Sequence, residues 1–154
     1  LHFAVLGGCV GIASDLLSHG ACVTLKDKYY GYNPIQLVAT KGSAATSARI
    51  VRLLVQYGAG LSNSLYLSVL SGNMGASIAL LACGADPSNR DEHECIPLHT
   101  AAVMCRRDIA TVLIGAYPGG VNCVDEKGWT PLHISARRND PQIIEMLVDA
   151  GSDL

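Results

Sequence analysis

Imidazole and thiol side chains, which are common zinc ligands, gather in one stretch of the sequence. His93, Cys95, His99 and Cys105 lie within thirteen residues, and Glu94 adds a carboxylate. Mixed nitrogen and sulfur ligands are typical of zinc sites. The spacing is irregular, however, and a histidine in the setting of His99 occurs again elsewhere in the chain. A recurring structural role explains these residues better than a metal site does, so we predict no metal.

Two other patterns could support chemistry on a nucleotide or a substrate. The segment Gly7-Gly8-Cys9-Val10-Gly11 is similar to a glycine-rich phosphate loop, which requires a strand before it and a helix after it. Here the segment is expected to lie between two helices. Nucleophilic catalysis requires a nucleophile, a base and an orienting group in one pocket, whereas the histidines of this chain recur with a repeated segment. We therefore predict no cofactor and no intrinsic enzymatic activity.

The elements that would position these residues recur along the chain. Residues 128–136 (GWTPLHISA) have an earlier counterpart in residues 96–102 (IPLHTAA), and Pro97 and Pro131 are 34 residues apart. Leucine-rich segments that end in a glycine–alanine pair follow the copies, for example at Gly84-Ala85. Self-similarity at an interval of about 20 to 50 residues is typical of repeat proteins. The pattern predicts a stacked array of small units.

The motifs Thr130-Pro131-Leu132-His133, with Ala136, and residues 80–86 (LLACGAD) resemble the ankyrin repeat. Five copies cover nearly the whole chain. The resemblance implies an all-α fold, an ankyrin-repeat solenoid of stacked antiparallel helix pairs with short hairpin loops. We predict one ankyrin-repeat domain over residues 1–154, an excerpt of a longer protein, with repeats at about 1–29, 30–61, 62–92, 93–126 and 127–154.

The last repeat indicates where its helices begin and end. Thr130 is a favourable N-cap, and Pro131 suits the first helical position because the missing N–H has no helical partner there. We predict a first helix from Pro131 to about Arg138. A second helix is expected to begin at Pro141, and Gly151 is expected to end it in a left-handed conformation.

Three departures from the repeat pattern have structural consequences. Residues 42–47 (GSAATS) are expected to add four residues between the two helices of the second repeat. Only seven steps separate Gly58 from Leu65, so the projecting hairpin is expected to be missing there. Gln36 and Tyr66 replace the histidine found at His99, which leaves open whether the side chain still binds the turn backbone in those repeats.

Composition narrows the possible settings of the chain. Hydrophobic residues make up 49% of it, but no run approaches the ~18 apolar residues of a membrane span, and we predict no membrane insertion. Eleven basic and thirteen acidic residues give a net charge of -2 without a basic stripe, so we predict no nucleic-acid partner. Six cysteines without CxxC spacing are predicted to be reduced, as in an intracellular, cytoplasmic or nuclear, protein.

The resemblance also implies where a partner would bind. In this family, partners meet the inner helices and the hairpin tips, so we predict a monomeric module that binds another protein or peptide as a scaffold or adaptor. The inner-helix positions that carry this prediction are Lys41, Leu70, Val103, Met104, Arg137 and Arg138, and the tip positions are Tyr29, Tyr30 and Trp129. An acidic tip at Asp91, Glu92 and Glu94 would favour basic partner residues.

Alternatives to this interpretation remain at each level. Leu70, Val103 and Met104 are predicted to form one apolar patch, but they could instead complete the packing between repeats. Trp129 could stack on the neighbouring hairpin rather than on a partner. The whole module could be the substrate-recruiting or targeting arm of a larger enzyme, such as a ubiquitin-ligase receptor, a phospholipase or a protein acyltransferase.

Overall fold

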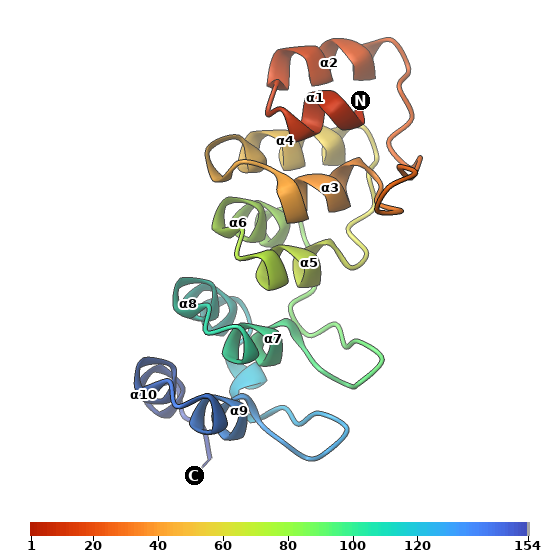
Figure 1. Ribbon diagram of the computed structural model, residues 1–154. Coiled ribbons are helices and arrows are strands. Elements are labelled where there is room, and N and C mark those ends of the chain that lie inside the picture. The colour runs from red at the N-terminus through yellow and green to blue at the C-terminus, as the bar shows by residue number, and fades with distance from the viewer. Residues whose placement is uncertain (154) are drawn as a thin grey trace. The chain divides into compact units, whose positions relative to one another are not determined.

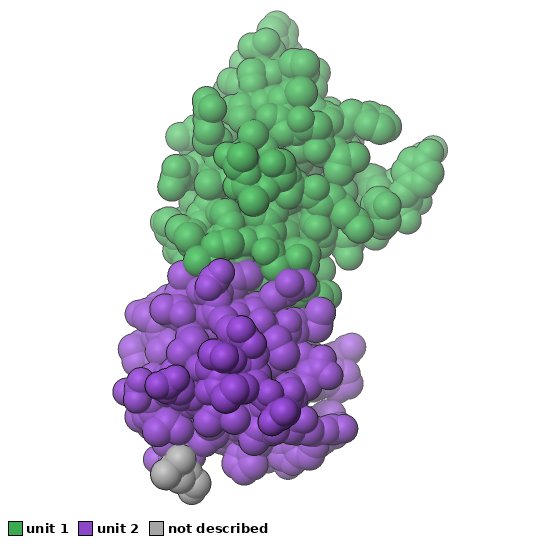
Figure 2. Space-filling model, turned by 60° about the vertical axis from the view of Figure 1, so that its left-hand side comes forward, with its two compact units in different colours: residues 1–85 green, residues 86–154 purple. Residues whose placement is uncertain are grey.

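The computed structural model describes residues 1–153. Within that range the chain forms ten α-helices and one short 3-10 helix, with no strand (Figure 1). The chain divides into two compact units, Leu1–Ala85 (unit 1) and Asp86–Leu154 (unit 2), which Figure 2 shows in different colours. The predicted all-α class of paired helices is confirmed.

Unit 1 contains three helix pairs. They are α1 (His2–Leu6) with α2 (Val10–Ser18), α3 (Pro34–Lys41) with α4 (Ala44–Gln56), and α5 (Ser64–Ser71) with α6 (Met74–Ala82). The first helices of the pairs pack side by side, α1 on α3 and α3 on α5, and the second helices form a parallel row from α2 to α4 to α6 (Figure 1). Between the two rows lie the fully buried side chains of Val38, Ile50, Leu54 and Leu80.

Unit 2 contains two helix pairs and the short 3-10 helix. They are α7 (Pro97–Val103) with α8 (Arg107–Ala116), then η1 (Pro118–Asn122), then α9 (Pro131–Arg138) with α10 (Pro141–Asp149). Helix α7 packs on α9, and α8 packs on α10. Leu113, Ile143 and Leu147 are almost fully buried among them, and each such side chain contributes roughly 1.5 to 3 kcal/mol of hydrophobic stabilisation.

The predicted helix limits of the last repeat are confirmed. Helix α9 spans Pro131–Arg138, with Thr130 as its N-cap and Pro131 in its first turn. The Thr130 hydroxyl accepts a hydrogen bond from the backbone N–H of His133 at 3.4 Å. Helix α10 begins at Pro141, and Gly151 follows it with a φ of +87°. Glycine adopts that left-handed conformation without a steric penalty.

The expectation of extra residues between the helices of the second repeat is wrong. Helix α3 ends at Lys41 and α4 already begins at Ala44, so the connection is short. The additional residues lengthen α4 to 13 residues, compared with 9 for α6. Residues 44–47 are two alanines, a threonine and a serine, which join the helix once its apolar face packs on α6. Even α4, the longest described helix, is too short to cross a membrane, and no helix among residues 1–153 meets the requirement.

The predicted loss of one hairpin is confirmed. In three inter-repeat loops a backbone N–H bonds to a carbonyl four or five residues later, from Asp27 to Tyr32, from Asp91 to Cys95 and from Asp125 to Trp129. Between Gln56, where α4 ends, and Ser64, where α5 begins, the chain takes a short path without projecting (Figure 1). The reason is length, because seven residues only bridge the two helices.

Two glycines at the same helical position are expected to respond oppositely to alanine. Gly11 and Gly75 are each the second residue of their helix, α2 and α6. A Cβ at Gly11 meets nothing within 4 Å, whereas one at Gly75 would lie 2.6 Å from the Ala44 carbonyl oxygen. We expect Gly11→Ala to raise the free energy of unfolding by about 0.5 kcal/mol and Gly75→Ala to lower it by about 1 to 3 kcal/mol, as measured by urea unfolding. Equal effects in the two variants would contradict this packing of α6 on α4.

Candidate partner-binding surfaces

An aspartate closes each of the three projecting loops. The Asp125 carboxylate accepts hydrogen bonds from the backbone N–H groups of Lys127 at 2.9 Å and Trp129 at 2.8 Å. Asp27 binds the N–H groups of its own loop in the same way, including that of Tyr32 at 2.7 Å. Although burial opposes ionisation, these N–H donors lower the pKa of both Asp27 and Asp125. The carboxylates are therefore structural parts of the loops.

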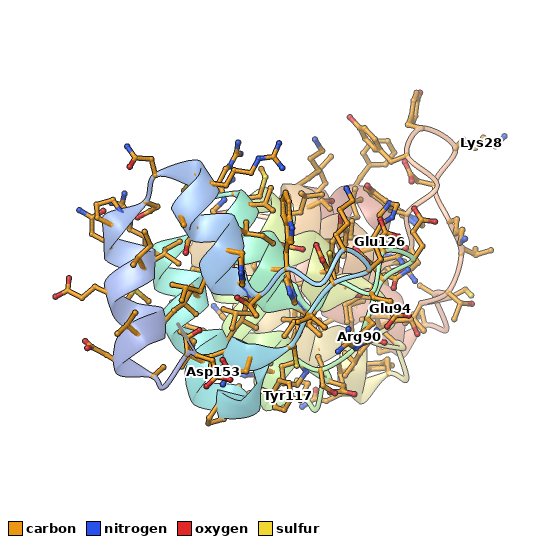
Figure 3. The ribbon with its side chains drawn as sticks, turned by 90° about the horizontal axis from the view of Figure 1, so that it is seen from below. Lys28, Arg90, Glu94, Tyr117, Glu126 and Asp153 are labelled. Atoms are coloured by element: carbon orange, nitrogen blue, oxygen red, sulfur yellow. The ribbon has the colours of Figure 1, made fainter. Side chains whose placement is uncertain are left out.

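The structural role of these aspartates was missed in the sequence, although a signal was present. Asp91 and Asp125 are 34 residues apart, which is the interval between Pro97 and Pro131. Asp91 binds the N–H groups of His93 and Cys95, each at 2.9 Å, so its charge is used within its own loop. Arg90 and Glu94 lie close together on the same loop (Figure 3), with Arg90 Nη1 3.5 Å from Glu94 Oε2. The acidic character expected at this tip is thus partly neutralised locally.

His99 connects the start of α7 to the next inter-repeat loop. Its Nδ1 accepts the backbone N–H of Ile96 at 3.2 Å, so its Nε2 carries the proton and donates to the Trp129 carbonyl at 3.0 Å. The ring is completely buried, and this burial lowers its pKa. Both ring nitrogens are occupied, which explains His99 without a metal. Within residues 1–153 there is no group of three or more His, Cys, Asp or Glu side chains placed to hold a metal ion.

Gln36 replaces this histidine in the second repeat and makes the same connection. Its Oε1 accepts the N–H of Asn33 at 3.2 Å, and its Nε2 donates to the Ser62 carbonyl at 3.4 Å. His2 reaches the Leu25 carbonyl at 3.0 Å in the first repeat. The question that the sequence left open at Gln36 is thereby answered, because an amide and a neutral imidazole each offer one acceptor and one donor at similar separation.

Four predicted partner-binding residues line one hollow in unit 2. Its volume is about 350 Å³, and its lining consists of Cys95, Val103, Asp125, Lys127, Trp129, Ile134, Arg137 and Arg138. The guanidinium carbon of Arg137 lies 5.1 Å from the centre of the Trp129 ring, a cation–π distance. Arg138 Nε donates to the Val103 carbonyl at 2.7 Å. Helices α7 and α9 and the loop before α9 thus bring Val103, Trp129, Arg137 and Arg138 together.

The Cys95 thiol at the edge of this hollow is unreactive at neutral pH. Burial, and then the nearby carboxylates of Asp91, Asp125 and Glu126, raise its pKa to about 11. The thiol therefore stays protonated, whereas nucleophilic attack and metal binding require the thiolate. All six cysteines of the chain are free.

Tyr29, Tyr30 and Lys41 come together in unit 1. The two tyrosines line a second hollow of about 300 Å³, whose other lining residues are Leu1, His2, Phe3, Leu6, Asp27, Lys28 and Leu37. Lys41 Nζ lies 5.3 Å from the centre of the Tyr30 ring, and Tyr30 stacks on Tyr32 at a centroid separation of 6.0 Å. Figure 3 shows Lys28 extending outward from the projecting loop. Phe3, with 85% of its surface exposed, was missed in the sequence.

The remaining two predicted residues lie apart from these hollows. Leu70 is half-buried near the end of α5 in unit 1, and Met104 is the half-buried C-cap of α7 in unit 2. Val103 is the more accessible of the α7 pair, with 39% of its surface exposed. The apolar patch that would join Leu70 to Val103 and Met104 stays a prediction, as does the alternative that these residues complete the packing between repeats.

Comparison with known proteins finds several relatives. The chain is 36% identical to the ARF GTPase-activating protein Git of Drosophila melanogaster over 95 residues, covering 61% of this chain and 13% of that protein. It is 28% identical to the nuclear factor NF-kappa-B p105 subunit of Gallus gallus over 165 residues, covering 99% and 16%. It is 40% identical to the RelA-associated inhibitor of Mus musculus over 67 residues, covering 44% and 8%. The chain spans less than a fifth of the length of each.

Two family models match the sequence. "Ankyrin repeats (3 copies)" matches residues 65–154, which is more than half of the chain, and "Ankyrin repeat" matches residues 1–28. Ankyrin repeats are generally protein–protein interaction modules and typically non-catalytic. The helix pairs of residues 1–153 agree with these matches. The chain therefore belongs to the ankyrin-repeat family.

Proposed function

We propose that the chain binds a protein or peptide partner through the inner helices and hairpin loops of its repeats, and that it acts as a scaffold or adaptor without catalysing a reaction. The convergence of Val103, Trp129, Arg137 and Arg138 on one hollow carries this proposal. Tryptophan and arginine are enriched among the residues that dominate binding energy at protein interfaces. A half-buried aromatic ring beside exposed cations combines apolar contact area with directional hydrogen bonding.

Further parts of the proposal concern the setting of the module. We place it inside the cell, in the cytoplasm or nucleus, because its six cysteines are free and one relative is named as a nuclear factor. It works as a monomer and binds no nucleic acid, in keeping with its net charge of -2. Light scattering of the purified chain would measure the oligomeric state directly.

A second candidate function is favoured by one relative. The Git protein is named as a GTPase-activating protein, and this chain matches only 13% of its length. The module would then recruit a substrate or target for an enzymatic activity that resides elsewhere in a longer protein. Both functions use the same binding surface, and the sequence of the parent protein distinguishes them.

A pair of matched valine variants tests the proposed surface. Val103 on α7 and Val148 on α10 are 39% and 40% exposed, but only Val103 lines the hollow. The immobilised wild-type chain is used to capture proteins from a cell extract, and mass spectrometry identifies them. We expect Val148→Asp to capture the same proteins and Val103→Asp to fail to capture them. Circular dichroism would confirm that both variants are folded. Retention of the same proteins by all three chains, or capture of none by the wild type, would contradict the proposal.

A further inference from the structure

The basic side chains around the unit 2 hollow are exposed to a partner, whereas the acidic side chain is already hydrogen-bonded. Lys127, Arg137 and Arg138 are exposed and cationic. The acidic side chain in the lining, Asp125, holds two backbone N–H groups of its own loop. Two further carboxylates act on Cys95: Asp91 binds backbone N–H groups of its loop, and Glu126 Oε1 lies 3.2 Å from His93 Nδ1. A partner at this surface therefore meets accessible positive charge and a carboxylate that is already hydrogen-bonded.

The two arginines are held in place before any partner arrives. The Arg137 guanidinium lies over the Trp129 ring at 5.1 Å, and Arg138 uses one of its five N–H donors to bind the Val103 carbonyl at 2.7 Å. Because the guanidinium groups are already positioned, less conformational entropy is lost when they bind an anion. Planar guanidinium groups bind carboxylates with two parallel hydrogen bonds.

Part of the lining of the hollow is apolar. Its lining includes Val103, which is 39% exposed, Ile134, which is almost completely buried, and the half-buried Trp129. A volume of about 350 Å³ admits an apolar side chain. The hollow therefore combines apolar and cationic side chains in one lining.

The same combination occurs independently in unit 1. Lys41 lies over the Tyr30 ring at 5.3 Å, and Lys28 lines a hollow that contains Phe3. The local carboxylate, Asp27, again binds backbone N–H groups of its own loop. The arrangement of exposed cations, aromatic rings and an engaged aspartate is thus repeated within one chain.

We propose that the unit 2 hollow binds an acidic peptide, with an apolar side chain on Val103, Ile134 and Trp129 and flanking Asp or Glu carboxylates on Arg137 and Arg138. The inference rests on the proposed function and specifies the chemistry of the partner. A peptide fits better than a nucleic acid because the cations gather around a side-chain-sized hollow, whereas nucleic acids bind extended basic tracks.

A display experiment with the intact chain tests this partner class. A random twelve-residue peptide library on phage is selected against wild-type chain 1–154, and enriched peptides are synthesised with a fluorescent label for anisotropy. We expect enriched sequences to contain an apolar residue flanked by Asp or Glu. Their affinity should fall as NaCl rises from about 50 to 300 mM, because salt screens exposed charges.

Charge-matched variants locate the binding site. The double variant Arg137→Gln/Arg138→Gln should bind the acidic peptides about tenfold or more weakly than the wild type does. Arg49→Gln/Arg52→Gln removes the same charge from exposed positions on α4 and should leave the affinity unchanged within about twofold.

The outcomes separate the two proposals. If the enriched peptides are neutral or basic and Val103→Asp weakens their binding, the acidic-peptide inference is overturned and the proposed function stands. Enriched peptides indifferent to both Val103→Asp and the Arg137/Arg138 variant would count against both. A labelled single-stranded oligonucleotide is tested at about 150 mM NaCl. If it binds the wild type and binds the Arg137/Arg138 variant more weakly, the ligand of this hollow is a nucleic acid and the peptide inference is overturned.

Discussion

Replacement of His99 by alanine is expected to lower the free energy of unfolding by about 3 to 5 kcal/mol. The imidazole is completely buried, so its loss leaves a cavity between α7 and the following loop. The buried Ile96 N–H would also lose its acceptor, at a cost of about 1 to 3 kcal/mol, and the Trp129 carbonyl would keep only the Asp125 N–H. Urea unfolding followed by circular dichroism would measure the change. A loss below about 1 kcal/mol would contradict the structural role of His99.

The variant His99→Gln provides the matched control. Gln36 makes the equivalent pair of hydrogen bonds in the second repeat, so glutamine should recover much of the stability that alanine loses.

The pH dependence of stability gives a second measurement of the same histidine. Burial lowers the folded-state pKa of His99, so between that pKa and the ordinary value of about 6.5 the unfolded chain binds more protons at this site. The contribution of His99 to the free energy of unfolding is therefore fully present above about pH 6.5 and declines as the pH falls below that value. In His99→Gln this part of the dependence of the free energy of unfolding on pH should vanish, as measured by urea unfolding at a series of pH values.

Replacement of Asn73 by alanine is expected to lower the free energy of unfolding by about 2 to 4 kcal/mol. Asn73 is 7% exposed and is the N-cap of α6, where its Oδ1 accepts the Ala76 N–H at 3.1 Å. Its Nδ2 reaches the carbonyls of Val38 at 3.1 Å and Gly42 at 3.0 Å. Loss of an N-cap costs about 1 kcal/mol, and the buried carbonyls would lose a donor. Urea unfolding of chain 1–154 would measure the loss.

The variant Asn73→Asp separates the two roles of the amide. Aspartate can still accept the Ala76 N–H, but it has no donor for the carbonyls of Val38 and Gly42. We expect it to be at least as unstable as Asn73→Ala, and the exposed control Asn89→Ala to change stability by less than about 0.5 kcal/mol. A fully stable Asn73→Asp would show that only the cap matters and that the connection from α6 to the α3–α4 turn does not.

Both variants concern polar groups that join one repeat to the next. His99 spans from α7 to the loop before α9, and Asn73 spans from α6 to the turn between α3 and α4. Neighbouring repeats therefore share directional hydrogen bonds in addition to apolar contact. In a repeat protein, stability depends on the units and on the interfaces between neighbours, so these side chains are expected to affect the cooperativity of unfolding within their units.

Much of the fold was predictable from the sequence because its determinants are local. The Thr130 cap, the proline at the start of α9 and the left-handed Gly151 act within one or two turns of backbone. The short segment after Gln56 likewise excludes a hairpin by its length alone. Two of the loop-closing aspartates, Asp91 and Asp125, were equally readable from their 34-residue spacing, since each binds N–H groups a few residues away.

Tertiary structure decided the features that depend on contacts between repeats. Residues 44–47 extend α4, which packs on α6, and a Cβ at Gly75 would lie 2.6 Å from a carbonyl oxygen of α4. The sequence by itself identified Val103, Trp129, Arg137 and Arg138 as surface candidates. Their convergence on one hollow required α7, α9 and the loop between repeats to fold together, since residues about 30 apart in sequence come into contact only when neighbouring repeats bury their apolar faces against each other.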